Sequence, residues 1–257
     1  MKGAVPSSAE QQLFFSPRPT RTMADKVLIP FELPNPESLS EVLVDDFSTL
    51  TVVVMGHYGV PEQTPRDIAR EQFEEEAQVT LDEIAARFVE RGANTKTRLV
   101  FGKERAASID RVAIEEGCAA ELDPAPTEGI EKILVPLPDV AEFERLPEFV
   151  RILCEESTKE ITLFHVVEGE EDRERGEEIV EKTREGMVGE GFDPEEVNTL
   201  IVEGEEHDDE IIRVADDYDA VVMYEAESRR GDRIFGTLPD RIRKKTGDPV
   251  VIVRRDY

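Results

Sequence analysis

The stretch KILVP (132–136), near the middle of the chain, repeats KVLIP (26–30) at a spacing of 106 residues. A second pair of segments, GKERAASIDRVA (102–113) and GEEHDDEIIRVA (204–215), is offset by 102 residues and shares its first glycine and an Ile-x-Arg-Val-Ala ending. Two matches in the same order at nearly equal spacing predict that the chain consists of two related halves.

Apolar runs alternate with helix-type patterns on the C-terminal side of KILVP, through the second half. Strands are expected at 132–137, 161–167, 199–202, 220–224 and 250–253, and helices at 147–156, 172–189, 207–217 and 238–246. Strands that are apolar throughout and separated by helices indicate a parallel, doubly wound α/β sheet with right-handed crossovers.

The first half begins in the same way but ends early. Thr64 is expected to be the N-cap of a long helix that stops at Gly92, and a further helix is expected at 104–117. Only CAAELDPAPTEG (118–129) then precedes the next repeat, so the last loop, helix and strand have no counterpart. We therefore expect two Rossmann-like domains, a truncated one at 23–128 and a complete one at 129–257.

The first 22 residues differ in charge from the rest of the chain. They hold three basic residues and one acidic residue, and Met23 then leads almost directly into the first strand. Either Met23 is the natural start, or residues 1–22 form a disordered extension.

The net charge of the chain is −28, with 59 acidic against 31 basic residues, few of which are Lys. Such acidity opposes general binding to nucleic acid or anionic membranes and is typical of a protein adapted to molar salt. Two cysteines without metal-ligand spacing fit a reducing cytoplasm, and no apolar run is long enough to insert into a membrane. No metal site and no catalytic set of residues is apparent, and His57 and His165 are expected to be structural.

Two interpretations fit GDRIFGTLPDRIRKK (231–245). Gly231, Gly236 and Thr237 could belong to a phosphate-binding loop, although the Lys of a Walker A loop is missing. Alternatively, Thr237 caps a helix, with Pro239 in the first turn and Asp240 completing a capping box.

Positive charge gathers at the end of this acidic chain. Residues 229–255 contain nine basic residues against three acidic ones, which an anion site, an acidic protein partner or the acidic first half would each explain. The apolar strand 250–253 is expected to be an exposed edge through which two copies pair as a homodimer.

The second half resembles the universal stress protein family in its tandem, haloarchaeal form, and the first half does so more weakly. The resemblance is carried by KILVPLPD (132–139), LFHVV (163–167), Gly204, DAVVM (219–223) and FGTLPDRIRKKTGDPVVIVRR (235–255). It implies a fold like that of the adenine nucleotide α-hydrolases.

The resemblance also implies ATP as a ligand of the second half. Matching the family's pattern gives these nucleotide-binding residues: Val135, Pro136, Asp139, Val166, Gly204, Gly231, Gly236 and Thr237. The first two glycines of the family's phosphate loop fall at Tyr224 and Glu227, and the charge of Glu227 would weaken binding.

The function expected from the resemblance is that of a cytoplasmic, non-catalytic binding module in stress response. Two alternatives remain open. One is a regulatory partner of a membrane transporter, and the other is an enzyme that slowly hydrolyses ATP or forms an adenylate, with Thr237 at the phosphates.

Overall fold

The computed structural model describes residues 26–61, 63–138, 145–154, 159–225 and 237–254. Its strands are β1 (Lys26–Leu33), β2 (Thr51–Gly59), β3 (Asn94–Gly102), β4 (Ala120–Asp123), β5 (Lys132–Pro136), β6 (Glu160–Val167), β7 (Val197–Glu203), β8 (Ala220–Tyr224) and β9 (Val250–Val253). Its helices are α1 (Glu41–Phe47), α2 (Arg66–Glu90), α3 (Arg105–Glu116), α4 (Arg145–Leu153), α5 (Glu170–Gly189), α6 (His207–Ala215) and α8 (Leu238–Thr246). The expected α/β class is confirmed. The expectations for residues 1–22 fall outside the described residues.

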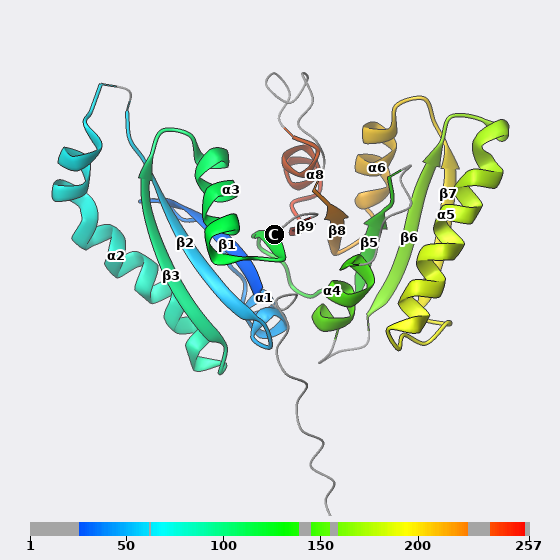
Figure 1. The fold of residues 1–257 in the computed structure, drawn as a ribbon, viewed down its shortest axis with the longest axis horizontal. Helices are drawn as coiled ribbons and strands as arrows, with labels where there is room; N and C mark the ends of the chain where they lie inside the picture. The colour runs from blue at the N-terminus through cyan, green and yellow to red at the C-terminus, as the bar shows by residue number, and fades with distance from the viewer. Residues whose placement is uncertain (1–25, 62, 139–144, 155–158, 226–236, 255–257) are drawn as a thin grey trace, which may run out of the picture.

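The two halves share one nine-stranded sheet with the order β3-β2-β1-β4-β9-β8-β5-β6-β7. Neighbouring strands are parallel within each half, whereas β4 and β9 are antiparallel. Figure 1 shows this sheet running across the molecule, with α2 and α5 at its two ends and α8 near the middle. The β4–β9 pair is called the seam below.

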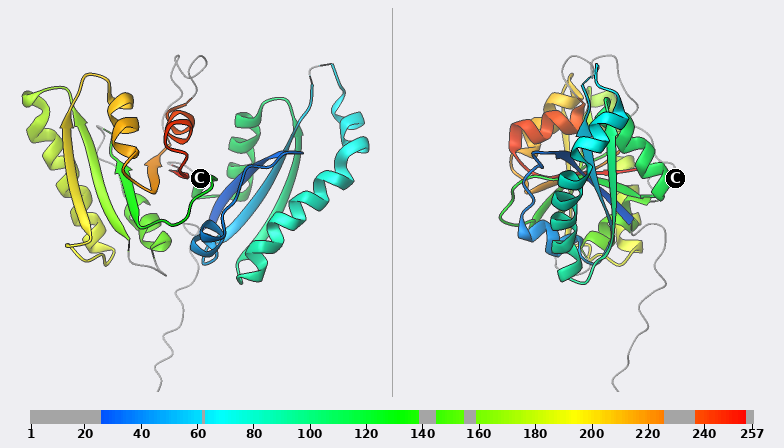
Figure 2. Two further views of the ribbon diagram at one scale, coloured as in Figure 1. Left: turned by 180° about the vertical axis from the view of Figure 1, so that it is seen from behind. Right: turned by 90° about the vertical axis from the view of Figure 1, so that its left-hand side faces the viewer.

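Helices cover both faces of the sheet because its strands are apolar on both sides. On one face, α1, α2, α4 and α5 pack over a core that is continuous from Val27 in the first half to Val253 in the second. On the other face, α3 covers a separate core in the first half, while α6 and α8 cover one in the second half. The views in Figure 2 show the helices on either side of the sheet.

Strand β9 is not an exposed edge. Val250–Val253 pair with Val221–Tyr224 on one side and with Ala120–Asp123 on the other, so backbone groups of this chain occupy both of its edges. The expectation of an open edge at 250–253 is therefore wrong, and with it goes the basis for a homodimer through this strand.

Strand β4 lies in the segment 118–129, which the sequence pattern did not identify as a strand. It runs parallel to β1, as β8 runs parallel to β5. The described residues 124–131 then lead directly into β5, so no helix and strand equivalent to α8 and β9 follow β4. As a result, α3 is the only described helix of the first half on its face of the sheet, and no first-half helix lies next to it over β4.

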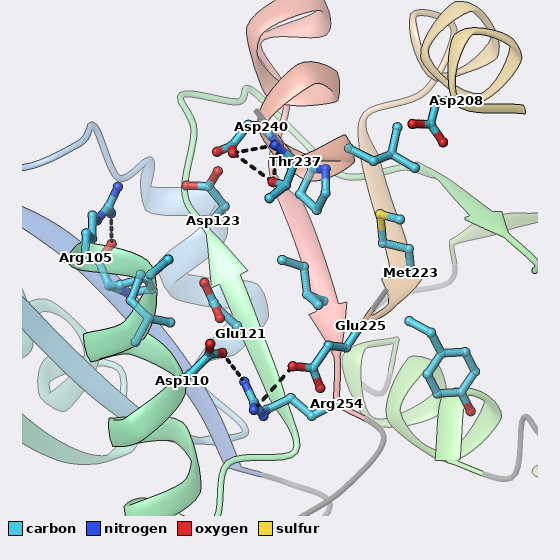
Figure 3. A pocket seen from close by; sticks show the side chains of 17 residues that line it. Arg105, Asp110, Glu121, Asp123, Asp208, Met223, Glu225, Thr237, Asp240 and Arg254 are labelled. Carbon is cyan, nitrogen blue, oxygen red and sulfur yellow. Dashed lines mark hydrogen bonds and ion pairs between the residues drawn. The ribbon is translucent and has the colours of Figure 1, made fainter. Parts of the chain in front are cut away.

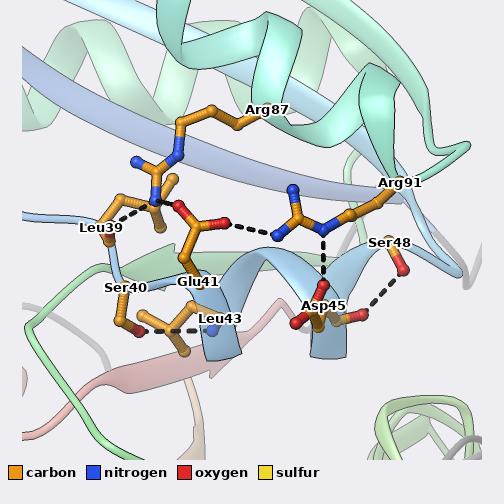
Figure 4. Close-up of polar contacts among 8 residues, drawn as sticks. All are labelled: Leu39, Ser40, Glu41, Leu43, Asp45, Ser48, Arg87 and Arg91. Carbon is orange, nitrogen blue, oxygen red and sulfur yellow. Dashed lines mark hydrogen bonds and ion pairs between the residues drawn. The ribbon is translucent and has the colours of Figure 1, made fainter.

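Ion pairs between helices reinforce the first half. In Figure 4, Arg91, the C-cap residue of α2, lies 2.5 Å from Glu41 and 2.8 Å from Asp45 of α1, and Arg87 of α2 also bonds Glu41. Ser40 caps α1 by accepting a hydrogen bond from the Leu43 N–H at 3.3 Å. By contrast, the cap of α2 is Pro65 rather than Thr64, and it makes no side-chain capping bond.

Candidate functional site

A cavity of about 420 Å³ lies over the seam, between α3 of the first half and α8 of the second (Figure 3). It occupies the face that a helix equivalent to α8 would cover in a complete first half. Its lining residues are Pro30, Arg105, Ala106, Ile109, Asp110, Glu121, Asp123, Asp208, Met223, Tyr224, Glu225, Thr237, Leu238, Pro239, Asp240, Ile252 and Arg254. This seam cavity is thus built by both halves together.

Strand alternation places two carboxylates in the seam cavity. Ala120 and Leu122 of β4 are fully buried in the core shared by both halves, whereas Glu121 and Asp123 point to the opposite face (Figure 3). Asp123 is paired with Arg243 of α8 at 2.6 Å. For Glu121, the described part of the chain offers neither a hydrogen bond nor an ion pair. Glu121 is therefore the acidic group of the cavity that is available to a ligand.

The environment of Glu121 favours its protonated form. Burial is the main cause that raises the pKa of Glu121 to about 7, and the charges of Asp110 and Asp123 raise it further, while Arg254 and Arg105 oppose them. Burial likewise raises the pKa of Asp123, although Arg243 opposes the shift. A cation placed beside Glu121 would stabilise the ionised carboxylate and so lower this pKa.

Two arginines of the second half form ion pairs with acidic residues of the first half at the cavity. Arg254 is 6 % exposed and lies 3.3 Å from Asp110 of α3 and 3.4 Å from Glu225, while Arg243 pairs with Asp123. Part of the basic surface at 229–255 is therefore used against the acidic first half, one of the three explanations above. A protein partner at this surface stays a prediction. Arg229, Arg230, Arg233 and Arg255 fall outside the described residues.

The N-terminus of α8 opens onto the cavity with its own cap in place. The Asp240 N–H donates to Thr237 Oγ1 at 3.4 Å, and Asp240 Oδ2 accepts from the Thr237 N–H at 3.1 Å and from its hydroxyl at 2.7 Å. The capping interpretation of Thr237 is confirmed. The Asp240 carboxylate already lies at the positive end of the helix dipole, where it would repel a phosphate.

Five of the predicted nucleotide-binding residues lie in the described part of the chain, and the structure places them as follows. Val135 and Val166 are buried in core clusters on opposite faces of the sheet, and Pro136 is buried beside Val135. Gly204 follows β7, where a side chain would come within 2.5 Å of Glu210 Cγ, so close packing against this side chain favours a glycine. Thr237 lines the seam cavity instead. Asp139, Gly231 and Gly236 lie outside the described residues.

The sequence pattern did not identify Glu121 and Asp110 as site residues, and it placed Arg254 only within the basic surface at 229–255. One signal was present: AELD (120–123) alternates small or apolar residues with acidic ones, as a strand with one polar face does. What no local pattern could reveal is that β9, more than a hundred residues later, lies beside this strand.

His57 and His165 make the internal polar contacts expected of structural histidines. His165 Nδ1 lies 2.9 Å from the Leu137 carbonyl oxygen, and His57 Nδ1 lies 3.0 Å from Glu32 Oε2. Burial raises the pKa of Cys118 and of Cys154 to about 12, so both thiols stay protonated. In the described ranges, no group of three or more potential ligands could hold a metal ion, and no helix has the length and hydrophobicity needed to cross a membrane.

No family model matches the chain, and no curated protein matches its sequence. Its structure is similar to that of a universal stress protein from Archaeoglobus fulgidus DSM 4304, with a TM-score of 0.60 at 14% identity over 91% of this chain and 100% of that one. A putative universal stress protein from Pseudomonas aeruginosa UCBPP-PA14 gives a TM-score of 0.52 at 12% identity over 90% and 94% of the two chains.

A shorter structure, a universal stress protein in complex with cAMP, matches 49% of this chain and 97% of its own at 16% identity. Its TM-score of 0.40 is too low for its ligand to be carried over. The two longer matches agree with the resemblance seen in the sequence. The chain therefore has the fold of the universal stress proteins.

Proposed function

We propose that the chain is a cytoplasmic, non-catalytic regulatory module that binds a small organic cation in the seam cavity. The observation that carries this proposal is Glu121, a partly buried carboxyl group that lines the cavity and has no hydrogen bond or ion pair among the described residues. A buried carboxylate without a partner is unfavourable, and a bound cation would supply one.

The composition of the walls supports an organic cation rather than an anion. Six acidic side chains and two arginines line the cavity, and Arg241 and Arg243 pair with two of the six, Asp208 and Asp123. Two negative charges remain in excess, so the cavity attracts cations. Ile109, Met223, Leu238 and Ile252 add apolar surface that would pack against the carbon atoms of a ligand. A primary amine or a quaternary ammonium compound combines these two properties.

A regulatory role follows from the position of the cavity. A ligand there would contact α3 and β4 of one half and α8 and β9 of the other. Because binding stabilises the arrangement that binds, such a ligand would strengthen the seam by mass action. Ligand binding would thus change the stability of the contact between the two halves.

The experiment is a calorimetric titration with choline and putrescine as probes in molar KCl at pH 8. One of the two should bind saturably to the wild type, and Glu121→Gln should weaken this binding at least tenfold, since a charge-assisted contact is lost. Glu128→Gln, at an exposed position of the same segment, is the matched control and should leave affinity unchanged. Equal affinity in the Glu121→Gln variant, or no binding of either probe, would refute the proposal.

ATP binding by the second half is the second candidate. It is favoured by the position of α8, whose N-terminus follows the carboxyl end of β8, where parallel sheets bind ligands. Asp240 opposes it, so Asp240→Asn should strengthen ATP binding and Gly236→Val should abolish it, both measured by calorimetry in molar KCl. If ATP binds to neither the wild type nor the Asp240→Asn variant, this candidate is wrong. The same samples, incubated and assayed for released phosphate, test slow ATP hydrolysis.

A further inference from the structure

Strand β7 lies at the outer end of the second half of the sheet (Figure 1), and β6 is its only neighbour among the described strands. The Gly204 N–H, directly after β7, donates to the Val167 carbonyl oxygen of β6 at 2.9 Å. Successive residues of a strand point their N–H and C=O groups to alternate sides. The even-numbered residues of β7 therefore face β6, and the backbone groups of Thr199, Ile201 and Glu203 point away from the sheet.

The beginning of this outer edge is covered by a side chain of the same half. Arg184 of α5 donates from Nε to the Val197 carbonyl oxygen at 3.2 Å and from Nη2 to the Pro194 carbonyl oxygen at 2.9 Å. Within 199–203, by contrast, no described residue forms a hydrogen bond with an outward N–H or C=O group. An extended chain laid along this stretch would find donors and acceptors at the spacing of a β ladder.

The side chains of the same stretch are apolar and only partly covered. Leu200 and Val202 pack against the core beneath α6 and α8, Ile201 packs against the core beneath α5, and all three remain partly exposed. In β6, which has a strand on each side, every residue after the first is buried. A strand added outside β7 would cover these three side chains and gain free energy from their burial.

The opposite end of the sheet is protected in a way that β7 is not. Strand β3 carries Lys96 and Arg98, both paired with Glu116 of α3, and charged side chains on an edge strand oppose the approach of another strand. From Val197 to Val202, β7 has no charged residue, although 35% of the chain is charged. The edge of β7 thus lacks the charges that normally prevent strand pairing.

Acidic residues at both ends of β7 determine which kind of partner fits this edge. Asp193 and Glu195 precede the open stretch, and Glu203 and Glu205 lie at its end. All four are exposed, and none forms an ion pair with a described basic residue. Two copies of β7, paired in either direction, would place acidic ends beside acidic ends, which is unfavourable. A peptide with basic residues on both sides of an uncharged stretch would meet opposite charges instead.

We propose that the outer edge of β7 binds an extended segment of another protein, in which lysine or arginine residues flank a short stretch of β-branched residues. The segment adds a strand to the sheet, and its backbone pairs with residues 199–203. Its side chains alternate between the two faces, over Ile201 on one and over Leu200 and Val202 on the other. The site shares no residue with the seam cavity and is independent of the cation site proposed above.

The probe is a fluorescent peptide of alternating threonine and valine residues with two lysines at each end, titrated with the full chain and followed by fluorescence anisotropy. KCl is kept at the lowest concentration at which circular dichroism shows the chain folded, because salt screens the terminal charges. Saturable binding at micromolar concentration is expected.

Two altered peptides separate backbone pairing from charge attraction. Methyl groups on the backbone nitrogens of the uncharged stretch remove the donors of a β ladder but keep every charge, and this peptide should bind at least tenfold more weakly. A peptide with glutamates in place of the lysines keeps the donors and should also bind at least tenfold more weakly.

Thr199→Pro tests the strand itself, because the N–H that it removes points away from β6. This variant should bind the lysine peptide at least tenfold more weakly. Thr199→Ala keeps the N–H at the same exposed position, so it is the matched control and should bind as the wild type does. Should Thr199→Pro fail to fold, the methylated peptide decides the question with the wild-type chain.

The proposal is overturned if the lysine peptide shows no saturable binding at millimolar concentration. It is also overturned if the methylated peptide or the glutamate peptide binds as tightly as the lysine peptide, or if folded Thr199→Pro binds as the wild type does. A wild-type dimer in light scattering that becomes a monomer in Thr199→Pro would make a second copy the occupant of this edge, against the proposal.

Discussion

At the scale of single residues, Lys159 of the second half forms a buried ion pair with α1 of the first half. Its ammonium group donates to Asp46 Oδ1 of α1 at 3.0 Å and to the Ile130 carbonyl oxygen at 2.9 Å, and the residue is only 3 % exposed. Burial raises the pKa of Asp46 even though Lys159 opposes the shift, which indicates how strongly the site is desolvated. Removing one partner leaves the other charge buried alone.

We therefore expect Lys159→Met to lower the free energy of unfolding by about 3 kcal/mol, the cost typical of a broken buried pair. The double variant Lys159→Met/Asp46→Asn should recover part of this loss, because no unpaired charge remains. Chemical denaturation in molar KCl measures both variants and the single variant Asp46→Asn. Lys182→Met, at an exposed position on α5, is the control and should change stability by less than about 0.5 kcal/mol. A loss in the double variant equal to the sum of the single losses would contradict the pairing.

The raised pKa of Glu121 predicts that the folding stability depends on pH. Its pKa in the folded protein is about 7, above the 4.5 of an ordinary Glu, so the folded state binds the proton more tightly than the unfolded state. Folding stability contributed by this group is greatest below pH 4.5 and decreases as the pH rises through 7. Glu121→Gln removes this decrease.

Relative to the wild type, Glu121→Gln should therefore gain on the order of 1 to 3 kcal/mol in free energy of unfolding between pH 4.5 and pH 8. Denaturation series at several pH values, compared with those of Glu128→Gln, provide the measurement. If the difference between Glu121→Gln and the wild type is the same at both ends of the range, Glu121 does not titrate near neutrality.

The contacts of a single residue were predictable where its partner lies close by in the sequence. The cap at Thr237 was predictable because its partner, Asp240, lies three positions away. The environment of Glu121 was not, since Asp110, Asp123 and Arg254 meet it only after β4 and β9 have paired. Likewise, nothing in the local sequence shows that Val135 and Val166 face opposite sides of the sheet, because that depends on the register of β5 and β6.

At the scale of elements, α8 combines several local signals that agree with one another. Its capping box, its early proline, its basic last turn and Gly247 at a φ of 82° all favour a helix of this length. This agreement explains why its limits match the sequence expectation, 238–246. Strand β4 was harder to recognise, because the alternation in AELD covers only four residues and its partner β9 is distant in the chain.

We expect Thr237→Ala to lower the free energy of unfolding by about 1 kcal/mol, the usual value of a helix N-cap. Thr237→Ser keeps the hydroxyl and should retain most of the stability. Urea denaturation midpoints of the three proteins in molar KCl test this expectation. Equal midpoints for the alanine variant and the wild type would show that the capping box contributes little.

At the scale of the whole molecule, the net charge of −28 is spread over a long, single sheet with helices on both faces. Like charges repel one another across such a molecule when salt is low. The Debye length falls from about 30 Å at 0.01 M salt to about 3 Å at 1 M, so added salt should remove most of this repulsion. Ion pairs such as those of Arg91 offset only part of the charge.

The thermal midpoint of unfolding should therefore rise steeply between low salt and molar KCl. Differential scanning calorimetry across this range measures the effect. Sodium chloride at equal ionic strength should act similarly, because screening depends on ionic strength rather than on the cation. A midpoint that stays constant across the range would mean that self-repulsion does not limit the stability of this protein.

The seam has a consequence for how a ligand would saturate the protein. Two identical antiparallel strands would be related by a two-fold axis, and any site beside that axis would occur twice. Here β4 and β9 differ in sequence, and only β9 is preceded by a helix of the α8 type, so the seam lacks that symmetry. A ligand of the seam cavity therefore meets one asymmetric site, and its binding isotherm should be hyperbolic, with a stoichiometry of one per chain and no cooperativity between equivalent sites.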